Sequence, residues 1–434
     1  MFSLKEEGKL TKLILGVTCL LFFLICIFSI FRYGNSTLLG SITNPDNDDV
    51  KFIRSAWILA DTGNYIYHTP STATVFMMPG LSFVLAFFVM IFGKFGGITA
   101  FRVFQAIVQT GSLFLVFLIA RKLFNSKVGI IAIIISILSI ADYWVSNLIL
   151  TETLFKFFLL CLLYFSIYAL EEQKTKYYVL GGVALGLATL FRPTIATFPI
   201  IILFMWILKK YKFKTMLKYT AIVAAVFCLI LSPWWVRNYS IFHKFIPLTL
   251  ATGNPTLQGT YINYDQSSAK TDGLNYSQFK YPADSEIANN EVEMEISKYR
   301  LTNLVPKHPF EFLQWYTVGK ADRQIHYPFF WSVDFLGVSS LMADLWHALT
   351  LLLSIIGGII YYLDRKRNKM GTLVIATIIY FIVVYLPFFT MGRYFYPAMP
   401  FVIIFTSYAV VNLAKIIRAQ MLRWMPVHKE EEIA

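Results

Sequence analysis

Long runs of apolar residues, separated by short polar clusters, recur along most of the chain. Each run approaches the roughly 20 residues that a helix needs to cross the hydrocarbon core of a bilayer. The first run, Leu13 to Phe31, is too long for a secretory signal, and no small-residue cleavage site follows it, so we expect a retained anchor. The pattern predicts ten spanning helices, at residues 11–32, 100–120, 128–145, 151–170, 177–191, 193–208, 217–236, 341–363, 371–389 and 396–416.

Two further segments are predicted to be helices that lie on the outer membrane surface without crossing it. Residues 76–93 form an apolar run of modest length that contains Pro79–Gly80. A crossing here would turn every later basic cluster outward, against the positive-inside rule. In residues 48–62, apolar side chains recur at helical spacing between polar positions. The first outer loop, 33–99, is therefore expected to hold two juxtamembrane helices.

The distribution of charge predicts the orientation of the chain. The formal net charge is +13, and the basic residues fall in short clusters between the apolar runs. Residues 239–340 differ, since they hold eight Lys/Arg and ten Asp/Glu, a net of −2 that leaves +15 for the remainder. The positive-inside rule then places 239–340 outside the cell membrane and both termini in the cytoplasm. Because topology explains the basic clusters, we expect no nucleic-acid partner.

The composition, 57% hydrophobic and 15% charged, indicates an all-α polytopic membrane protein in contact with membrane lipids. We expect three parts: a transmembrane module at 1–236, an extracytoplasmic segment of mixed structure at 237–340, and transmembrane helices with a cytoplasmic tail at 341–434. A helix is expected within the outer segment, at 284–304. The four cysteines all lie in apolar runs, so we expect thiols buried in lipid and no disulfide framework.

Ionisable side chains gather where the predicted helices meet the outer surface. Such groups are costly at membrane depth and are by default candidates for a functional site. Each also has a structural interpretation: the arginines could snorkel to lipid headgroups, Glu152 could favour a helix N-terminus, and Asp46 and Asp49 could serve in a turn and an N-cap. The candidates are Asp48, Asp49, Glu152, Arg192, Arg237 and Arg393, with Asp46 and Asp142 close to them in the sequence.

Together these charges suit a site that handles a hydroxyl acceptor and an anionic leaving group. A carboxylate can accept the proton of the acceptor, and cations can neutralise a departing phosphate. Because a leaving phosphate is a weak base that needs no proton, one catalytic carboxylate suffices, unlike the acid and base pair of a glycoside hydrolase. A transferase that uses a lipid-phosphate sugar needs this combination.

Six short motifs follow one another along the chain: DDVKF after the first helix, the interfacial MPGLSFVLAFFVMIFG, TETLF, GVALGLATLFRP, SPWWVRNY and GRYFYPAMPF. In this order they resemble the GT-C superfamily of polytopic glycosyltransferases. The chain looks most like the bacterial branch related to protein O-mannosyltransferases and to the lipid A aminoarabinose transferase. The resemblance covers nearly the whole chain.

The resemblance implies roles for particular residues. Asp48 matches the first acid of the loop-one motif and would be the catalytic base. Asp49 matches the second acid, which has a substrate-positioning or metal-proximal role. Glu152 matches the acid of the second outer loop and would bind substrate. Arg237 and Arg393 match positions near the lipid phosphate, and Arg192 is a further candidate for substrate binding. The chain departs from the family in having Asp49 where relatives have Glu, Phe52 where they have Tyr, and a single proline in the interfacial segment.

The implied reaction is inverting transfer of a sugar from a polyprenyl-phosphate donor to an acceptor hydroxyl on the extracytoplasmic face. The acceptor class stays open among glycan, polymer, lipid and protein of the envelope. Aromatic and amide side chains of the outer segment, Tyr261, Asn263, Tyr264, Trp315 and Trp331, could contact sugars or instead pack that segment onto the membrane. Family members differ in metal dependence, so a divalent metal is left open, and His68, His243 and His308 form no metal-binding pattern.

Two other classes of function are compatible with parts of this pattern. A transporter or flippase of polyprenyl-linked sugars would also need arginines near lipid phosphates, but it predicts charges through the midplane and repeat symmetry. A non-catalytic membrane protein whose outer domain binds a partner would leave the acids at 48, 49 and 152 without a role. The one-sided gathering of charge favours the transferase.

Overall fold

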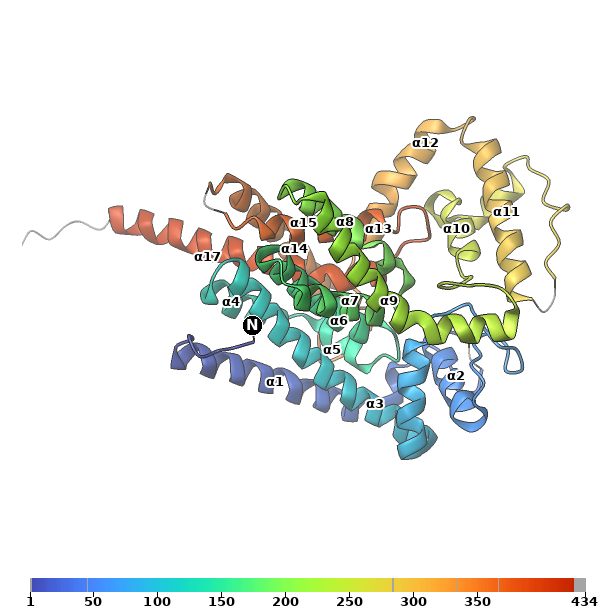
Figure 1. Cartoon of the computed structure of the whole chain (residues 1–434), viewed down its shortest axis with the longest axis horizontal. Coiled ribbons are helices and arrows are strands. Elements are labelled where there is room, and N and C mark those ends of the chain that lie inside the picture. The colour runs from blue at the N-terminus through green and yellow to red at the C-terminus, as the bar shows by residue number, and fades with distance from the viewer. Residues whose placement is uncertain (1, 45, 283–284, 333, 366, 425–434) are drawn as a thin grey trace, which may run out of the picture.

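The structure is a computed structural model that describes residues 2–44, 46–282, 285–332, 334–365 and 367–424. Over these residues the chain is helical, without strands and with two isolated bridges, Ile66 to Ala73 and Phe335 to Val338. The long helices run side by side along the longest axis of the molecule, and the helices of 253–325 lie beyond one end of this bundle (Figure 1). The prediction of an all-α polytopic membrane protein is confirmed. The tail from residue 425 lies outside the described residues.

Six helices among the described residues are long and apolar enough to cross a membrane. The first three are α1 (Lys9–Tyr33), α3 (Gly80–Leu123) and α6 (Glu152–Glu172). The others are α9 (Phe213–Phe242), α14 (Ser340–Leu363) and the run that begins at α16 (Gly392–Phe395) and continues through η6 (Tyr396–Ala398) into α17 (Met399–Trp424).

The other expected spans have different shapes. Residues 128–145 fall on α4 (Ser126–Ile137) and α5 (Ile140–Asn147), which are bent by 60° at their break. Three others form short helices, namely α7 (Thr175–Thr189), η2 (Pro193–Thr197) with α8 (Pro199–Leu208), and α15 (Met370–Val383). The count of ten crossings therefore stays a prediction.

The apolar segment before the second long helix folds back on itself. The chain changes direction at Gly93, whose φ of 74° and ψ of 173° favour glycine. A Cβ at Gly97 would lie 2.7 Å from the Cα of Val89, so the two arms of α3 touch. The first arm and α2 (Asp48–Thr62) stand across the direction of the bundle (Figure 1). This arrangement agrees with two helices along the membrane surface, and their position in the membrane stays a prediction.

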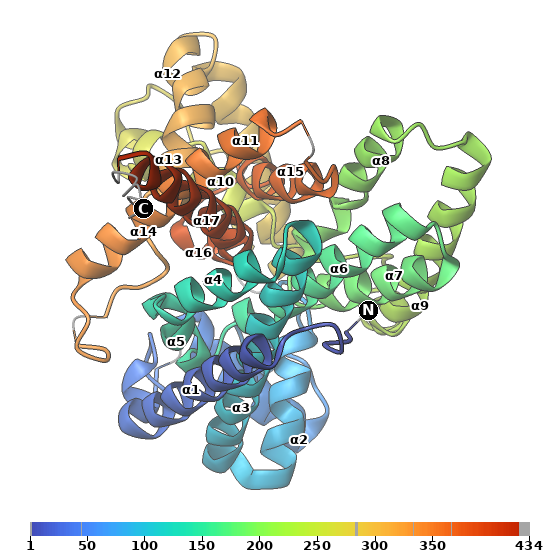
Figure 2. The same cartoon turned by 90° about the vertical axis from the view of Figure 1, so that its left-hand side faces the viewer.

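The bundle core forms around α6, most of whose length is buried. Figure 2, seen along the bundle, shows α7 and α9 on one side of α6, and α14 and α17 on the other side of the molecule. Close helix contacts depend on small residues: a Cβ at Gly357 of α14 would lie 2.0 Å from the carbonyl oxygen of Phe405 in α17. Close backbone approach of this kind is typical of helix packing in membranes.

The predicted outer segment is built from short helices. They are α10 (Gly253–Gly259), η3 (Ile262–Tyr264), η4 (Gln266–Lys270), α11 (Glu286–Leu304), α12 (Pro309–Gln314), η5 (Trp315–Gly319) and α13 (Lys320–Ile325). Its mixed structure is thus helix and irregular chain. Helix α11 matches the helix expected over 284–304, although residue 284 lies outside the described residues. Helix α9 continues to Phe242, six residues past the predicted end of the span.

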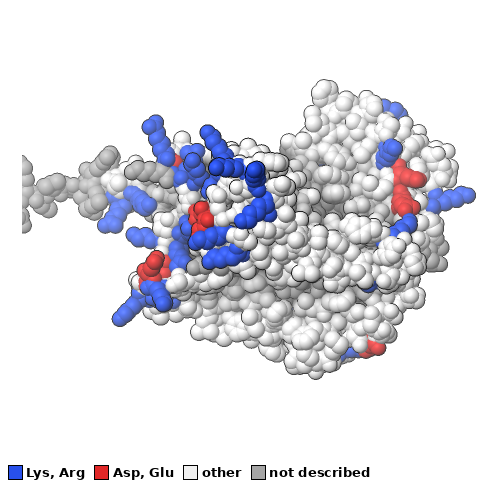
Figure 3. Space-filling view, viewed as in Figure 1, with Lys and Arg blue, Asp and Glu red and all other residues white. Residues whose placement is uncertain are grey.

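On the face that Figure 3 shows, charged side chains gather at both ends of the molecule and leave a broad band between them without charge. Figure 3 shows Lys and Arg concentrated at the end where α17 leaves the bundle. Acidic and basic side chains are mixed at the opposite end, over the helices of the outer segment. Such a band is expected for a protein whose middle lies in hydrocarbon, and basic residues at one end are typical of a cytoplasmic face.

Candidate active site

Four ionisable side chains from four separate parts of the chain form one continuous set of ion pairs. Asp48 Oδ2 lies 2.7 Å from Arg393 Nη1. The Nε of Arg393 donates to Glu152 Oε1, and Arg192 Nη2 lies 2.5 Å from the same oxygen. The order is therefore Asp48, Arg393, Glu152, Arg192. With two carboxylates and two guanidinium groups, the set is formally neutral, as buried charges require. We call these four residues the charge cluster.

Local structure explains how the four residues reach one place. Asp48 is the first residue of α2 and Glu152 is the first residue of α6, and a helix N-terminus favours a carboxylate. Arg192 lies between α7 and η2, where the backbone turns before Pro193. The amide of Gly80 donates to the carbonyl of Leu190 at 2.9 Å, and a Cβ at Gly80 would meet that oxygen at 2.6 Å. Glycine at position 80 thus lets the first arm of α3 approach the segment that carries Arg192.

The Asp48 carboxylate is fixed by a second partner. The hydroxyl of Tyr67 donates to Asp48 Oδ1 at 2.7 Å. Burial alone would raise the pKa of Asp48, but the charge of Arg393 and the bond from Tyr67 outweigh burial and lower that pKa. The Asp48 side chain keeps 35% of its surface exposed. Asp48 is therefore an ionised carboxylate that a second molecule can reach.

Glu152 differs from Asp48 in being completely buried. Its Oε1 accepts from both arginines, while its Oε2 has no hydrogen-bond partner among the described residues. The Nη1 of Arg192 is also buried without a hydrogen-bond partner among the described residues. The guanidinium of Arg192 also lies over the rings of Phe155 and Tyr394, at 5.5 Å from each centroid. Arg192 lines the neighbouring pocket and Glu152 does not, so the unpaired Nη1 of Arg192 marks where a polar ligand group would be stabilised.

A pocket of about 220 Å³ opens beside the charge cluster. Asp48, Arg192 and Arg393 line it together with Thr151 and Thr194. The rest of its wall is mostly apolar, from Phe52, Phe76, Met77, Met78, Phe191, Pro255, Tyr385, Phe388, Phe389 and Tyr394. A pocket with a few convergent charges on an apolar wall is typical of a ligand site and suits a molecule with an anionic head and an apolar body.

Two predicted site residues lie elsewhere. Asp49 is completely buried and accepts the backbone amides of Leu39 at 2.6 Å and Val50 at 2.8 Å. Burial raises the pKa of Asp49 despite these bonds. Asp49 is absent from the residues that line the pocket, so its carboxylate holds the loop before α2.

Arg237 likewise supports a loop. Its Nη1 donates to the carbonyl of Thr74 at 2.6 Å and its Nη2 to that of Tyr65 at 3.3 Å. The guanidinium lies among the rings of Tyr65, Trp234 and Phe242. Arg237 therefore fixes the loop after α2 that carries Tyr67, and it does not line the pocket.

Sequence reasoning missed Tyr67, Lys156 and Tyr396. Tyr67 reaches Asp48 from a loop in which no periodic pattern points to a contact. Lys156 lies one turn after Glu152 in α6 and pairs with Asp142 at 2.5 Å. A signal for Lys156 was present, because a lysine inside an apolar run is rare and is usually paired.

The outer-segment aromatics and the histidines are used mainly in packing and local ion pairs. Tyr264 contacts Trp315 at a ring separation of 4.8 Å and bonds to Thr390 Oγ1 at 2.7 Å, whereas Trp331 is 47% exposed. His68 pairs with Glu286, and His308 with Glu311. Among the residues that the structure describes, no three His, Cys, Asp or Glu side chains come close enough to hold a metal ion.

Comparisons with known proteins agree with this picture at the level of fold. Residues 74–236 match the family described as dolichyl-phosphate-mannose-protein mannosyltransferase. No curated protein matches the sequence. The structure of the Archaeoglobus fulgidus oligosaccharyltransferase in the apo form superposes with a TM-score of 0.56 at 17% identity, over 97% of this chain and 52% of that one.

Two other solved structures are also similar. The Archaeoglobus fulgidus oligosaccharyltransferase AglB with an inhibitory peptide and a dolichol-phosphate gives a TM-score of 0.53 at 16% identity, over 95% of this chain and 52% of that one. ArnT from Cupriavidus metallidurans, bound to undecaprenyl phosphate, gives a TM-score of 0.43 at 13% identity. The match covers 94% of this chain and 81% of that one. The chain thus spans about half the length of the oligosaccharyltransferase structures. The predicted resemblance to GT-C glycosyltransferases is confirmed for the fold and for a mannosyltransferase-family segment.

Proposed function

We propose that this chain is a membrane glycosyltransferase of the GT-C type that transfers a sugar from a polyprenyl-phosphate donor to an acceptor hydroxyl on the extracytoplasmic face. One observation supports this proposal most strongly. An accessible, ionised carboxylate, Asp48, shares one pocket with two arginines, Arg192 and Arg393. A base and cations on one wall are what a transfer from a phosphate leaving group requires.

In the proposed reaction Asp48 acts as the general base. It accepts the proton of the acceptor hydroxyl while the acceptor oxygen forms a bond to the anomeric carbon of the sugar. The bond from that carbon to the phosphate oxygen breaks, and its electron pair leaves with the phosphate. Attack opposite to the leaving group inverts the anomeric centre. No second carboxylate is needed, because the polyprenyl phosphate leaves as an anion.

Arg393 has two tasks in this scheme. Before the donor binds, it neutralises Asp48 and keeps the pKa of that carboxyl low. A lipid phosphate in the pocket would compete with Asp48 for the same guanidinium. Sharing Arg393 with the phosphate weakens its hold on Asp48, so donor binding would make the carboxylate a stronger base. Arg192, whose Nη1 is unpaired, would take a further phosphate oxygen.

The form of the donor follows from the same pocket. Its apolar wall suits the isoprenoid part of a lipid-linked sugar next to the charged phosphate. AglB has been solved with a dolichol-phosphate, which is a ligand of this chemical class. The sugar and the acceptor, whether a glycan, polymer, lipid or protein, are not specified by these contacts. The charge distribution supports a multi-pass protein of the cell membrane with both termini in the cytoplasm (Figure 3).

Binding of undecaprenyl phosphate to the purified full-length protein in detergent tests the donor class, with dioleoyl phosphatidic acid as an equally charged lipid control. We expect undecaprenyl phosphate to bind more tightly than the control lipid. Arg393→Ala should weaken binding about tenfold or more, as expected for loss of a charge-assisted hydrogen bond. Equal affinity for the two lipids, or binding that is indifferent to Arg393, would contradict the proposal.

A further inference from the structure

Helix α6 and the short turn of α16 and η6 are joined by two polar contacts, one above the other. Glu152 and Lys156 lie four residues apart on α6, so they share one face of that helix. Arg393 and Tyr396 lie three residues apart on the turn. In the first contact Arg393 Nε donates to Glu152, and in the second Lys156 Nζ donates to the hydroxyl of Tyr396 at 2.7 Å.

The second contact belongs to a closed buried network of Asp142, Lys156 and Tyr396, here called the triad. Lys156 Nζ lies 2.5 Å from Asp142 Oδ1, and the hydroxyl of Tyr396 donates to the same carboxylate oxygen. The amide of Gln109 donates to the Tyr396 oxygen at 3.0 Å. Lys156 is 2% and Tyr396 3% exposed. A buried network whose members satisfy one another rigidifies the elements that it joins.

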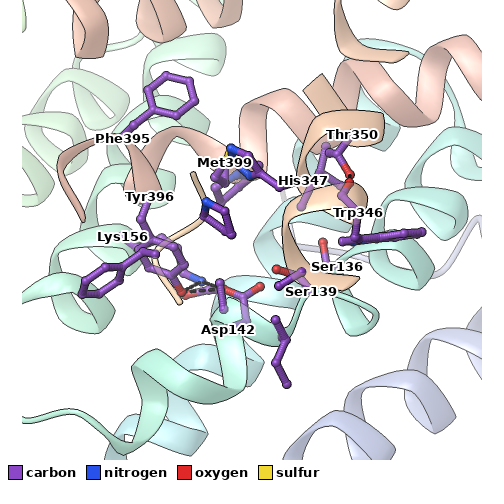
Figure 4. A pocket seen from close by; sticks show the side chains of 18 of the residues that line it. Ser136, Ser139, Asp142, Lys156, Trp346, His347, Thr350, Phe395, Tyr396 and Met399 are labelled. Atoms are coloured by element: carbon purple, nitrogen blue, oxygen red, sulfur yellow. Dashed lines mark hydrogen bonds and ion pairs between the residues drawn. The ribbon is translucent and has the colours of Figure 1, made fainter. Parts of the chain in front are cut away.

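The turn separates the triad from the proposed active site. Arg393 and Tyr394 line the pocket beside Asp48, whereas Phe395 and Tyr396 face a different cavity (Figure 4). Asp142, Lys156 and Tyr396 converge on one wall of that cavity. Its volume is about 40 Å³, which holds a few water molecules and no sugar. The triad is therefore better suited to holding the turn than to binding a substrate.

We infer that the triad of Asp142, Lys156 and Tyr396 is a positioning group that sets the place of Arg393. Such a group acts where the helical geometry changes, because the run Gly392–Met421 opens as the four-residue α16 and passes through the three-residue η6 before it continues as α17. Arg393 must reach Asp48 and Glu152 at once, and a misplacement of about 1 Å can cost about a hundredfold in rate. This inference rests on the proposed function, in which Arg393 also meets the lipid phosphate.

A double-mutant comparison tests the inference with undecaprenyl phosphate binding to the full-length protein as the readout. Tyr396→Phe keeps the ring and removes the hydroxyl on which the triad closes. If the triad acts through Arg393, Tyr396→Phe weakens binding about tenfold in the native background. In the Arg393→Ala background the same change should cost less than about twofold, because the residue that it positions is gone.

Tyr361→Phe is the matched control. Tyr361 is fully buried in α14, and its hydroxyl donates to the carbonyl of Asn368 at 2.7 Å, away from the charge cluster. It should leave the affinity unchanged. A second variant, Asp142→Asn with Lys156→Met, removes both charges without leaving either buried alone. This double variant should weaken binding of undecaprenyl phosphate as much as Tyr396→Phe does. If Tyr396→Phe lowers the thermal midpoint more than Tyr361→Phe does, the double variant replaces Tyr396→Phe as the test of the positioning role.

The outcomes separate this inference from the proposal on which it rests. If native protein binds undecaprenyl phosphate but Tyr396→Phe costs as much without Arg393 as with it, the triad is general scaffold and the positioning role is overturned. Unchanged affinity in both triad variants overturns it too. If native protein fails to bind undecaprenyl phosphate, the proposed function itself fails, and the role assigned to the triad fails with it.

Discussion

Asp48 and Arg393 are 345 positions apart in the sequence, and their side chains meet at 2.7 Å between Oδ2 and Nη1. The contact joins the first helix after the amino-terminal span to the turn that opens the last span. It also neutralises the carboxylate that we propose as the base. The predictions below follow from this contact and from the groups around it.

Asp48→Asn should abolish sugar transfer while the protein still folds. The amide keeps the shape of the carboxylate but cannot accept a proton, and loss of general-base catalysis costs about a hundredfold to ten-thousandfold. Incorporation of sugar into endogenous acceptors in isolated membranes measures the effect. Asp46→Asn is the matched control, because Asp46 lies two residues before Asp48 and its side chain is exposed. It should keep native activity.

Arg393→Lys should lower transfer strongly although it keeps the charge. The guanidinium contacts Asp48 through Nη1 and Glu152 through Nε, and a single ammonium cannot reproduce that geometry. We expect a loss of about tenfold or more, as for a charge-assisted hydrogen bond. The same assay in isolated membranes applies, with the exposed Arg418→Lys of α17 as control. Native activity in Arg393→Lys would show that charge alone suffices.

The pH dependence of transfer should report the lowered pKa of Asp48. Protonated Asp48 is inactive, so activity is retained above the folded-state pKa and lost as the pH falls through it. Tyr67→Phe removes the hydrogen bond to Oδ1, which raises that pKa and should move the acid limb of the pH profile to higher pH. Tyr65→Phe, whose hydroxyl instead donates to the carbonyl of Met77 at 3.0 Å, should leave the limb in place. An unmoved limb in Tyr67→Phe would rule out this control of Asp48.

Glu152→Ala should destabilise the protein. It leaves Arg192 and Arg393 without their shared carboxylate, and breaking a buried ion pair by removing one partner costs about 3–5 kcal/mol. Glu291→Ala removes a carboxylate whose side chain is 64% exposed and 3.9 Å from Lys244, so it should cost less than about 1 kcal/mol. Thermal unfolding in detergent compares the two, and equal midpoints would contradict a structural role for Glu152.

The predicted topology can be tested by cysteine labelling in a background without the four native cysteines. Lys94 lies at the bend of α3, and Lys127 lies at the start of α4; both are exposed. A membrane-impermeant maleimide added to intact cells should label Lys94→Cys and spare Lys127→Cys until the membrane is opened. Labelling of both positions from outside would contradict the predicted crossing at 100–120, and labelling of Lys127→Cys alone would reverse the predicted orientation of that span.

Apolar runs located the helices but not their breaks. The run over 128–145 is continuous in hydropathy, yet the structure divides it between Ile137 and Ile140 with a bend of 60°. No proline or glycine marks that point in the sequence. Ser136, whose hydroxyl bonds back to the carbonyl of Ala132, and Ser139, the N-cap residue of α5, flank the break, and a count of apolar residues does not weigh such polar positions. The reversal at Gly93 was easier to anticipate because the positive-inside rule forbade a crossing there.

Site residues could be found where their charge was unusual for their surroundings. Asp48, Glu152, Arg192 and Arg393 stood out because ionisable residues are scarce in this apolar chain. Asp49 could not be separated from Asp48 by residue type, and only the helix geometry turns its carboxylate toward Leu39. Tyr67 and Tyr396 were missed since tyrosines are common here, and nothing local distinguishes those that bond to a carboxylate.

The most direct test of Asp48-dependent sugar transfer is mass spectrometry of envelope glycoconjugates from cells that lack this protein. Such cells would be complemented in parallel with the native chain, Asp48→Asn or Asp46→Asn. We predict that a sugar-sized mass is absent without the protein, returns with the native chain and with Asp46→Asn, and stays absent with Asp48→Asn despite equal amounts of protein in the membrane. Full return of that mass with Asp48→Asn would contradict the account.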